Sequence, residues 1–200
     1  MRIISGLAKG TRLNAPDGRS LRPTEDRVKE SVFSSLGDLR GCLVIDLFSG
    51  TGALGLEALS RGAAKVVFLE RDRNHIKFIE SNLAAVRKAI GPAVGECSIV
   101  CADARNTMTA LAEFACRADV ILADPPYSET ADDFGPTAII SSNEFAAWAG
   151  PQCILSLEHS SSTILPWHPL SCWEPIKEKD FGIRAVSMAR LFREDGNDNE

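Results

Sequence analysis

Between residues 43 and 159, the chain alternates five short apolar runs with segments of helical periodicity. The apolar runs lie at 43–48, 65–70, 97–101, 119–124 and 153–159. Helices are expected at 53–60, 72–90, 105–116 and 143–149, with a polar loop before the last of them. Short strands that are apolar throughout and alternate with helices are typical of a parallel sheet covered on both faces. The sequence therefore predicts an α/β fold.

The chain after residue 160 follows a different pattern. Two extended segments, about 173–180 and 184–192, meet at Phe181-Gly182. Such a pair predicts an antiparallel hairpin. Together with the five apolar runs, it gives a mostly parallel seven-stranded sheet with a C-terminal antiparallel hairpin.

The first 37 residues precede this alternation. Residues 2–22 are rich in Gly, Pro and Arg and contain two short apolar runs, RIIS and TRLNA, which predict a small N-terminal β-hairpin. A helix is expected from Pro23, with Thr24 as its N-cap and Gly37 just after its end. The sequence thus predicts an extension at 1–22, a main domain at 23–193 and a disordered acidic tail at 194–200.

Composition narrows the class of protein. Hydrophobic residues make up 44% and charged residues 24% of the 200-residue chain, which is typical of a globular protein. We expect no membrane span and no secretory signal, because long uncharged apolar runs are missing from the sequence. The six cysteines include no C-x-x-C pair, so we expect buried thiols in a reducing cytoplasm and no metal site.

Charge is distributed unevenly along the chain. The formal net charge is −5, yet residues 1–30 hold seven basic and four acidic side chains, which leaves +3. This basic segment is either a solvated surface or a patch that binds phosphates on an otherwise acidic protein. The basic side chains considered for phosphate binding are Arg2, Lys9, Arg12, Arg19 and Arg22.

Four carboxylates stand at the ends of four consecutive predicted strands. They are Asp46, Glu70, Asp103 and Asp124. In open α/β sheets, ligands bind beyond the carboxyl ends of the strands. Any one of these acids alone is most simply a helix cap, but all four together predict a shared polar ligand.

A glycine-rich turn follows the first apolar run. The segment from Gly50 through Gly52 to Gly55 matches G-x-G-x-x-G, and Glu70 lies 20 residues past Gly50. Glycines permit a tight turn and a close approach of ligand to backbone. The acid can accept hydrogen bonds from ribose hydroxyls, so the motif alone fits both NAD and S-adenosylmethionine.

Three details favour S-adenosylmethionine. Asp46 suits a cationic amino-acid group and would repel a pyrophosphate. A helix precedes the first strand and could cover the pocket. Asp103, followed by Ala104, can accept a hydrogen bond from an adenine amino group.

The sequence Asp124-Pro125-Pro126-Tyr127 ends the fourth apolar run. Two prolines fix φ and remove two N–H donors, so the carbonyls of the turn are left as acceptors. Asp124 and the Pro125 carbonyl could accept the hydrogens of a planar amine, while Tyr127 stacks on its ring. We therefore expect Asp124, Pro125 and Tyr127 to be catalytic.

These motifs carry a family resemblance. DLFSGTGALGLEALSRGA, FLERD, DA and DPPY together resemble amino-group methyltransferases that use S-adenosylmethionine. RIISGLAKGTRL, LRPTEDRVKESVFSSL and KEKDFGIRAVSMARL are similar to RsmD-type 16S rRNA guanine-N2 methyltransferases, so the resemblance runs from residue 2 to about 192. The chain departs from the family pattern at Phe181-Gly182-Ile183-Arg184, where Tyr-Gly-Asp-Thr is usual, and in an acidic loop after DPPY.

The resemblance implies a Rossmann-like class I methyltransferase fold and methyl transfer to a guanine N2 amine of 16S rRNA, free or in an assembling small subunit. It implies that the five basic side chains of the N-terminal extension bind RNA phosphates. We expect a cytoplasmic monomer. The cofactor contacts expected are Asp46, Phe48, Gly50, Gly52, Glu70, Asp103, Ala104 and Thr24.

Other interpretations remain open. DPPY is shared with adenine-N6 and cytosine-N4 methyltransferases, so a DNA or RNA adenine-N6 enzyme is one alternative. An NAD-dependent oxidoreductase is another, although it leaves DPPY without a role. An RNA-binding module without catalysis would not need DPPY either.

Overall fold

The computed structural model describes residues 1–16, 23–126 and 134–193, without the side chains of residues 23–25. Within these ranges, seven strands form one sheet in the order β3-β2-β1-β4-β5-β7-β6. The strands are β1 (Leu43–Leu47), β2 (Lys65–Glu70), β3 (Glu96–Cys101), β4 (Val120–Ala123), β5 (Ile154–Ser160), β6 (Trp173–Asp180) and β7 (Arg184–Leu191).

The strand pairing confirms the predicted architecture. β1 pairs in parallel with β2 and β4, and β3 and β5 extend the parallel sheet on either side. β7 is antiparallel to both β5 and β6, so the last two strands form the expected hairpin at one edge. Each strand begins and ends within one residue of its predicted bounds.

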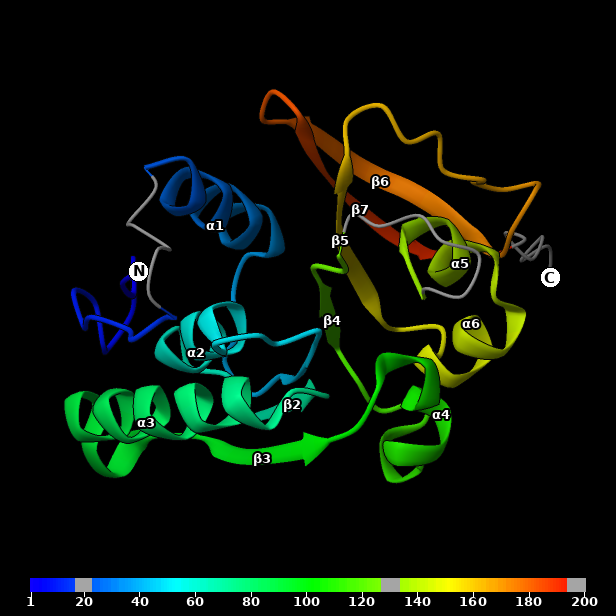
Figure 1. Cartoon of the computed structure of the whole chain (residues 1–200). Coiled ribbons are helices and arrows are strands. Elements are labelled where there is room, and N and C mark those ends of the chain that lie inside the picture. Colours follow the sequence, from blue (N-terminus) through cyan, green and yellow to red (C-terminus); the bar gives the residue numbers. More distant parts are fainter. Residues whose placement is uncertain (17–22, 127–133, 194–200) are drawn as a thin grey trace, which may run out of the picture.

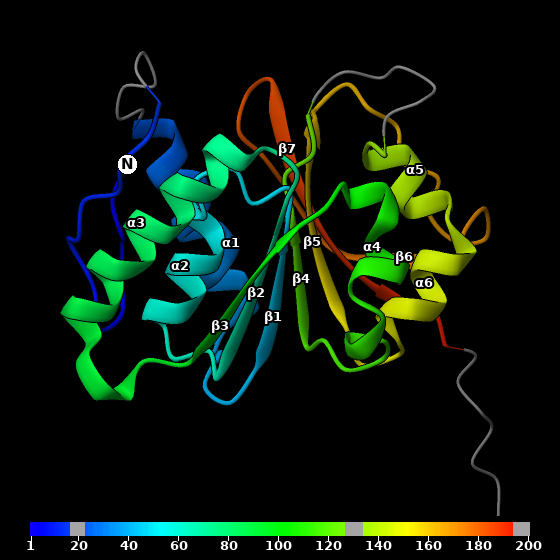
Figure 2. The ribbon, with the colours of Figure 1, turned by 60° about the horizontal axis from the view of Figure 1, so that its bottom comes forward.

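Six α-helices of the described chain cover the two faces of the sheet (Figures 1 and 2). Their bounds are α1 (Pro23–Leu36), α2 (Ala53–Ser60), α3 (Arg73–Ile90), α4 (Thr107–Ala110), α5 (Pro136–Ser141) and α6 (Asn143–Ala149). The first three helices lie on one face and the last three on the other (Figure 2).

The two faces bury separate hydrophobic cores because successive strand residues point to opposite faces. Val44, Val66 and Leu122 pack with residues of α1, α2 and α3. Ile45, Val67 and Ile121, their neighbours in sequence, pack with residues of α5 and α6. The central strands are thus apolar on both faces, which is why their sequences read as continuous apolar runs.

The structure corrects two helix predictions. The helix expected at 105–116 is broken: α4 covers only Thr107–Ala110, between short 3₁₀ turns at Ala104–Asn106 and Ala112–Phe114. The Leu111 carbonyl, which follows the last residue of α4, accepts a hydrogen bond from the Trp148 indole at 3.2 Å. This carbonyl is thus used in a tertiary contact at the point where the helix ends. In the segment expected to be a polar loop, α5 begins at Pro136.

The N-terminal hairpin is present in a short form. The Ile3 N–H donates to the Thr11 carbonyl at 2.9 Å, and the Leu13 N–H donates to the Met1 carbonyl at 3.0 Å. One antiparallel bridge, between Arg2 and Arg12, is all the ladder that forms among the described residues of this segment. The following helix starts at Pro23, so Thr24 lies inside its first turn and is not the N-cap.

Candidate functional site

The parallel strands bring the four predicted acids to one edge of the sheet. Asp46 lies in β1 and Glu70 ends β2, while Asp103 comes two residues after β3 and Asp124 directly follows β4. Along the sheet their order is Asp103, Glu70, Asp46 and Asp124, because β1 lies between β2 and β4. The expectation that these acids gather at the carboxyl edge is therefore met.

The glycine-rich turn joins β1 to α2 at this edge. The Gly52 N–H donates to the Ser49 carbonyl at 2.7 Å, which closes the turn. Gly50 and Gly52 have φ of 54° and 80°, in the left-handed region that favours glycine. Among the described residues, a Cβ at Gly50 would meet only the Phe48 carbonyl oxygen, at 3.9 Å, which leaves room for a ligand between those residues.

Asp46 is buried at the start of this turn, with 1% of its surface exposed. Its Oδ2 accepts a hydrogen bond from the Gly55 N–H at 2.8 Å. Burial raises the pKa of Asp46 to about 8, and the nearby charges of Asp124 and Glu70 act in the same direction. The carboxyl group is thus poised to lose a proton when a cation comes close.

Glu70 holds the turn from the neighbouring strand. Its Oε2 accepts the Gly50 N–H at 2.7 Å, and its Oε1 accepts the Asp72 N–H at 2.8 Å. Each carboxylate oxygen has two lone pairs, so each can accept one further hydrogen bond. Glu70 can therefore shape the turn and still accept ribose hydroxyls.

Asp103 lies between two arginines. Its carboxylate pairs with Arg105 Nε at 2.9 Å and with Arg71 Nη1 at 3.3 Å. The hydrogen bond from the Arg105 side chain is the main cause that lowers the pKa of Asp103 to about 2. Asp103 also caps the 3₁₀ turn that begins at the buried Ala104. Asp103 is thus a fixed acceptor that stays ionised at neutral pH.

The DPPY segment lies only partly within the described residues. Asp124 is exposed after β4, and Pro125 is buried behind it. Tyr127, the third residue predicted to be catalytic, lies outside the described residues, as does the acidic loop after it. Asp124 nevertheless contributes to the pKa of Asp46, so the DPPY strand end and the glycine-rich turn are neighbours.

Phe48 and Thr24 are two further residues predicted to contact the cofactor. Phe48 is half-buried and has φ of 58°, a left-handed conformation that is uncommon for a non-glycine residue. It packs against the core on the α5–α6 side of the sheet while its backbone starts the turn. The side chain of Thr24 lies outside the described part. The cofactor roles of both residues stay predictions.

Three of the five N-terminal basic residues predicted to bind RNA lie within the described residues. Arg2 pairs with Asp26 of α1 at 3.1 Å, and its side chain is 59% exposed. Lys9 and Arg12 are exposed, whereas Arg19 and Arg22 lie outside the described residues. The geometry brings the three described side chains onto one segment that is open to solvent, and their RNA contact stays a prediction.

The sequence reasoning missed residues that position this segment and the turn. Glu57 of α2 is fully buried, and its two carboxylate oxygens accept the backbone N–H groups of Ile4 and Ser5 at 2.7 and 3.0 Å. Asn82 of α3 donates to the Thr51 and Asn14 carbonyls, both at 3.0 Å. The available signal was a polar residue within the apolar stripe of a helix, at spacing that places Asn82 beside Ile79 and Val86.

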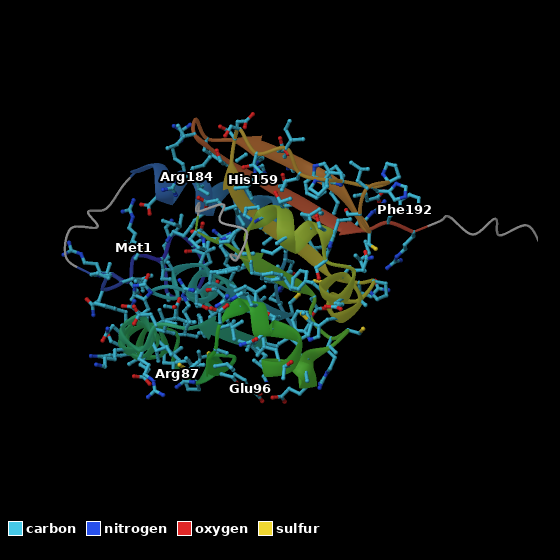
Figure 3. All side chains as sticks on the ribbon, turned by 45° about the vertical axis from the view of Figure 1, so that its right-hand side comes forward. Met1, Arg87, Glu96, His159, Arg184 and Phe192 are labelled. Atoms are coloured by element: carbon cyan, nitrogen blue, oxygen red, sulfur yellow. The ribbon has the colours of Figure 1, made fainter. Side chains whose placement is uncertain are left out.

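On the side of the sheet formed by β5, β7 and β6, a chain of polar side chains runs from the buried His159 and Ser187 to the exposed Glu178. The His159 Nε2 lies 2.8 Å from the Ser187 hydroxyl, which donates to Glu178 at 2.8 Å. Beside it, Arg184 pairs with Glu158 at 3.0 Å, and Figure 3 shows Arg184 and His159 at the same end of β5 and β7. These bonds join three strands and hold the C-terminal hairpin against the parallel sheet.

Comparison with known proteins identifies the family. A family model described as Conserved hypothetical protein 95 matches residues 1–190. The chain belongs to this family. It is 32% identical over 189 residues to the Ribosomal RNA small subunit methyltransferase D of Escherichia coli strain K12, covering 94% of this chain and 88% of that protein. The protein of the same description from Haemophilus influenzae is 31% identical over 190 residues, covering 92% and 90% of the two chains.

Solved structures agree with these relatives. The yhhF protein of Escherichia coli superposes with a TM-score of 0.72 at 29% identity, covering 96% of this chain and 97% of that chain. The rRNA methyltransferase aviRa of Streptomyces viridochromogenes has a TM-score of 0.64 at 19% identity, covering 92% and 91%, which supports the fold alone. This chain is therefore an RsmD-type methyltransferase with the class I fold, as the sequence resemblance predicted.

Two kinds of feature are missing from the described residues. Among their helices, none combines the length and apolar character needed to cross a bilayer. Groups of three or more His, Cys, Asp or Glu side chains arranged to hold a metal ion are likewise missing from the described residues.

Proposed function

We propose that this protein transfers a methyl group from S-adenosylmethionine to the exocyclic N2 amine of a guanine in 16S ribosomal RNA. The observation that carries the proposal is the position of Asp124 and Pro125 at the end of β4, beside the glycine-rich turn that ends β1. The relatives described as methyltransferases of small-subunit ribosomal RNA support the choice of substrate.

The residues at the edge fit the cofactor chemically. S-adenosylmethionine supplies a methyl group on a positively charged sulfur, which makes that carbon electrophilic. Asp46 would face the amino group of its amino-acid part, and Glu70 would accept its ribose hydroxyls. Asp103, held by Arg71 and Arg105, would accept the adenine amino group. The open space beside Gly50 would let the ligand approach the backbone.

The target amine needs help because its lone pair is delocalised into the guanine ring. Asp124 and the Pro125 carbonyl would accept hydrogen bonds from its two N–H groups, which favours a pyramidal nitrogen and stabilises the positive charge that develops on it. As the new N–C bond forms, the bond between the methyl group and sulfur would break, S-adenosylhomocysteine would leave, and the nitrogen would lose one of its protons. Tyr127 would stack on the base, which must leave any helix in which it is paired. Fixing the amine in line with the methyl group supplies much of the remaining rate.

The N-terminal extension would hold the RNA. Arg2, Lys9, Arg12, Arg19 and Arg22 would contact phosphates, which position the substrate without reading its sequence. Hydrogen bonds to Glu57 of α2 and Asn82 of α3 fix the backbone of this exposed segment, so its side chains are held in place for such contacts.

The direct test uses the full-length protein, S-adenosylmethionine with a labelled methyl group, and 16S rRNA or small subunits from cells that lack this enzyme. Nucleoside analysis should find N2-methylguanosine. N6-methyladenosine would favour the adenine enzyme instead, and calorimetry showing binding of NAD but not of S-adenosylhomocysteine would favour an oxidoreductase.

Asp124→Ala is the first variant to examine. It should abolish methyl transfer, while S-adenosylhomocysteine affinity and melting temperature change little, because the carboxylate acts on the target amine. Asp38→Ala is the matched control, since Asp38 is exposed before β1 at the opposite edge of the sheet. A loss of folding in the Asp124 variant would instead make Asp124 a structural cap.

A further inference from the structure

Strand β6 contains a bulge that turns two lysines toward α1. Pro175 pairs with Ala189 and Lys177 pairs with Met188, so Ile176 is an extra residue in the ladder. Without the bulge, Ile176 would pair with Met188 and would lie on the side of the sheet that faces α1. Bulges re-aim side chains in this way. Here Ile176 is 52% exposed, and Lys177 and Lys179 take the side that faces α1.

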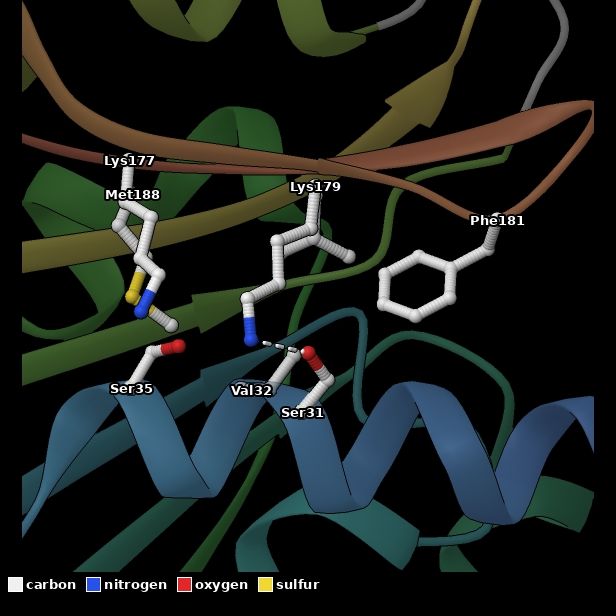
Figure 4. A pocket seen from close by; sticks show the side chains of 8 residues that line it. Ser31, Val32, Ser35, Lys177, Lys179, Phe181 and Met188 are labelled. Atoms are coloured by element: carbon white, nitrogen blue, oxygen red, sulfur yellow. Dashed lines mark hydrogen bonds between the residues drawn. The ribbon is translucent and has the colours of Figure 1, made fainter.

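The lysines line a narrow slot between α1 and the C-terminal hairpin (Figure 4). Its lining consists of Ser31, Val32, Ser35, Lys177, Lys179, Phe181, Val186 and Met188. Lys179 Nζ donates to the Ser31 hydroxyl at 2.7 Å. The Ser35 hydroxyl is buried and has no hydrogen-bond partner within the described part of the chain, and Figure 4 shows it on the side of the slot where Lys177 lies.

The charge of this slot differs from that of the whole chain. Two ammonium groups and two hydroxyls line it, and its lining holds no acid, while the chain as a whole has a formal net charge of −5. Cations and hydroxyl donors together suit a group with several acceptor oxygens and negative charge. A phosphate is such a group, and lysine binds it as a point charge.

The slot is also well placed relative to the carboxyl edge. β7 begins at Arg184, which pairs with Ser160 at the carboxyl end of β5, so the turn that contains Phe181 lies at the same edge as the four acids. Phe181 forms the end of the slot nearest this edge, and Lys177 lies farther from it along β6. α1, the other wall, starts directly after the basic N-terminal extension.

We propose that Lys177 and Lys179 bind a backbone phosphate of the RNA substrate at the mouth of this slot, beside Ser31 and Ser35, since the slot itself has room for only about one water molecule. The proposal rests on the proposed function and deepens it, since it adds a second contact surface away from the N-terminal extension. Phe181 at the end of the slot offers a ring for the neighbouring nucleotide. RNA held at both surfaces would be fixed on either side of α1, and this would orient the target base toward Asp124.

The experiment measures binding of in vitro transcribed 16S rRNA to the full-length protein loaded with S-adenosylhomocysteine, across a series of salt concentrations. Lys177→Met and Lys179→Met remove the charge and keep most of the aliphatic side chain. Each should reduce the slope of log K against log salt by about 0.7, and the double variant should reduce it by about 1.4. Lys→Arg at both positions should retain the wild-type slope.

Two controls separate phosphate binding from other effects. Lys88→Met removes an exposed lysine in the last turn of α3, and it should leave the slope unchanged. Cofactor affinity and melting temperature should stay close to wild type in the double Met variant, because the methionine side chains still cover the apolar floor formed by Val186 and Met188.

Two results would overturn the proposed phosphate site, and a third would overturn only the proposed function. A wild-type slope in the double Met variant would overturn the proposal, because the lysines would then only cover the seam between α1 and β7. Weaker binding to assembled small subunits with unchanged binding to naked rRNA would also overturn it, in favour of a protein partner. If the wild type binds rRNA but forms no methylguanosine, the proposed function fails, while the salt slopes still test the phosphate site.

Discussion

The ends of β1 and β3 carry the same type of side chain in opposite electrostatic states. Asp46 at β1 is buried against the backbone of α2, and its pKa is raised to about 8. Asp103 at β3 is paired with two arginines near solvent, and its pKa is lowered to about 2. One edge of the sheet thus offers an acid that can give up a proton and an acid that remains a permanent acceptor. For a ligand with an ammonium group at one end and an adenine at the other, these two states are complementary.

The largest effect is expected from breaking the packing at the end of β1. A Cβ at Gly55 would collide with the Phe68 ring and lie 2.9 Å from Asp46 Oδ2. We expect Gly55→Ala to lower the free energy of unfolding by about 3 kcal/mol, because the core must shift to accept the methyl group. Chemical denaturation measures this difference.

Gly135→Ala is the control for that variant. Gly135 has φ of −84°, and a Cβ there would meet no described residue within 4 Å. The control should stay within about 0.5 kcal/mol of wild type. Equal effects of the two substitutions would contradict the tight fit at Gly55.

A second prediction concerns the proton on Asp46. Its raised pKa means that the folded state keeps this proton between about pH 4 and 8, whereas the unfolded chain loses it near pH 4. Stability from this group is therefore complete at low pH and falls as pH rises, by up to about 1.4 kcal/mol per pH unit. Asp46→Asn cannot titrate and should flatten this part of the stability profile, as measured by denaturation from pH 4.5 to 7.5.

The same proton predicts a calorimetric result. Binding of S-adenosylmethionine at pH 7 should release a proton, because its ammonium group favours the ionised form of Asp46. Titrations in buffers of different ionisation enthalpy would detect the release, and the Asp46→Asn variant should show less of it. Identical proton release in both proteins would place the ammonium group elsewhere.

The smallest effect is expected at Asp103, with the opposite sign. Its lowered pKa gives stability that is present above about pH 4 and is lost as pH falls toward 2. Because Asp103 lies near solvent, Asp103→Asn should remove less than about 1 kcal/mol of this stability. Denaturation of both proteins between pH 2 and 5 measures it, and a stability difference that grows as pH falls would contradict the sign.

Much of the fold could be predicted because the central strands are buried on both faces. A run such as Leu43–Leu47 cannot be exposed at either face, so its sequence marks its position with little ambiguity. The helix at 105–116 was predicted wrongly because its interruption depends on Trp148, a residue 37 positions away from Leu111. α5 had a local signal that could have found it, namely Pro136 at its first position after Gly135.

The site, like the fold, could be predicted from the sequence only in part. Strand order is enough to bring Asp46, Glu70, Asp103 and Asp124 to one edge, so their gathering was predictable. Their protonation states were not, because the pKa of Asp46 depends on burial beneath α2 and on the N–H of Gly55, which are tertiary features. Nor does the spacing of Glu57 along α2 indicate that it binds the backbone of residues 4 and 5.

The position of Glu57 determines how far this protein can be truncated from its N-terminus. Its carboxylate has three donors: the backbone groups of Ile4 and Ser5, and the Arg61 side chain at 2.9 Å. Deleting the first 22 residues would remove two of the three and leave a buried charge with one partner, which is strongly destabilising. The N-terminal segment, which the sequence predicts to be an extension, thus stabilises α2 by supplying hydrogen-bond donors to Glu57. A truncated protein built from residue 23 onward would be a damaged enzyme, and any engineering of the RNA-binding end should exchange side chains and keep the backbone.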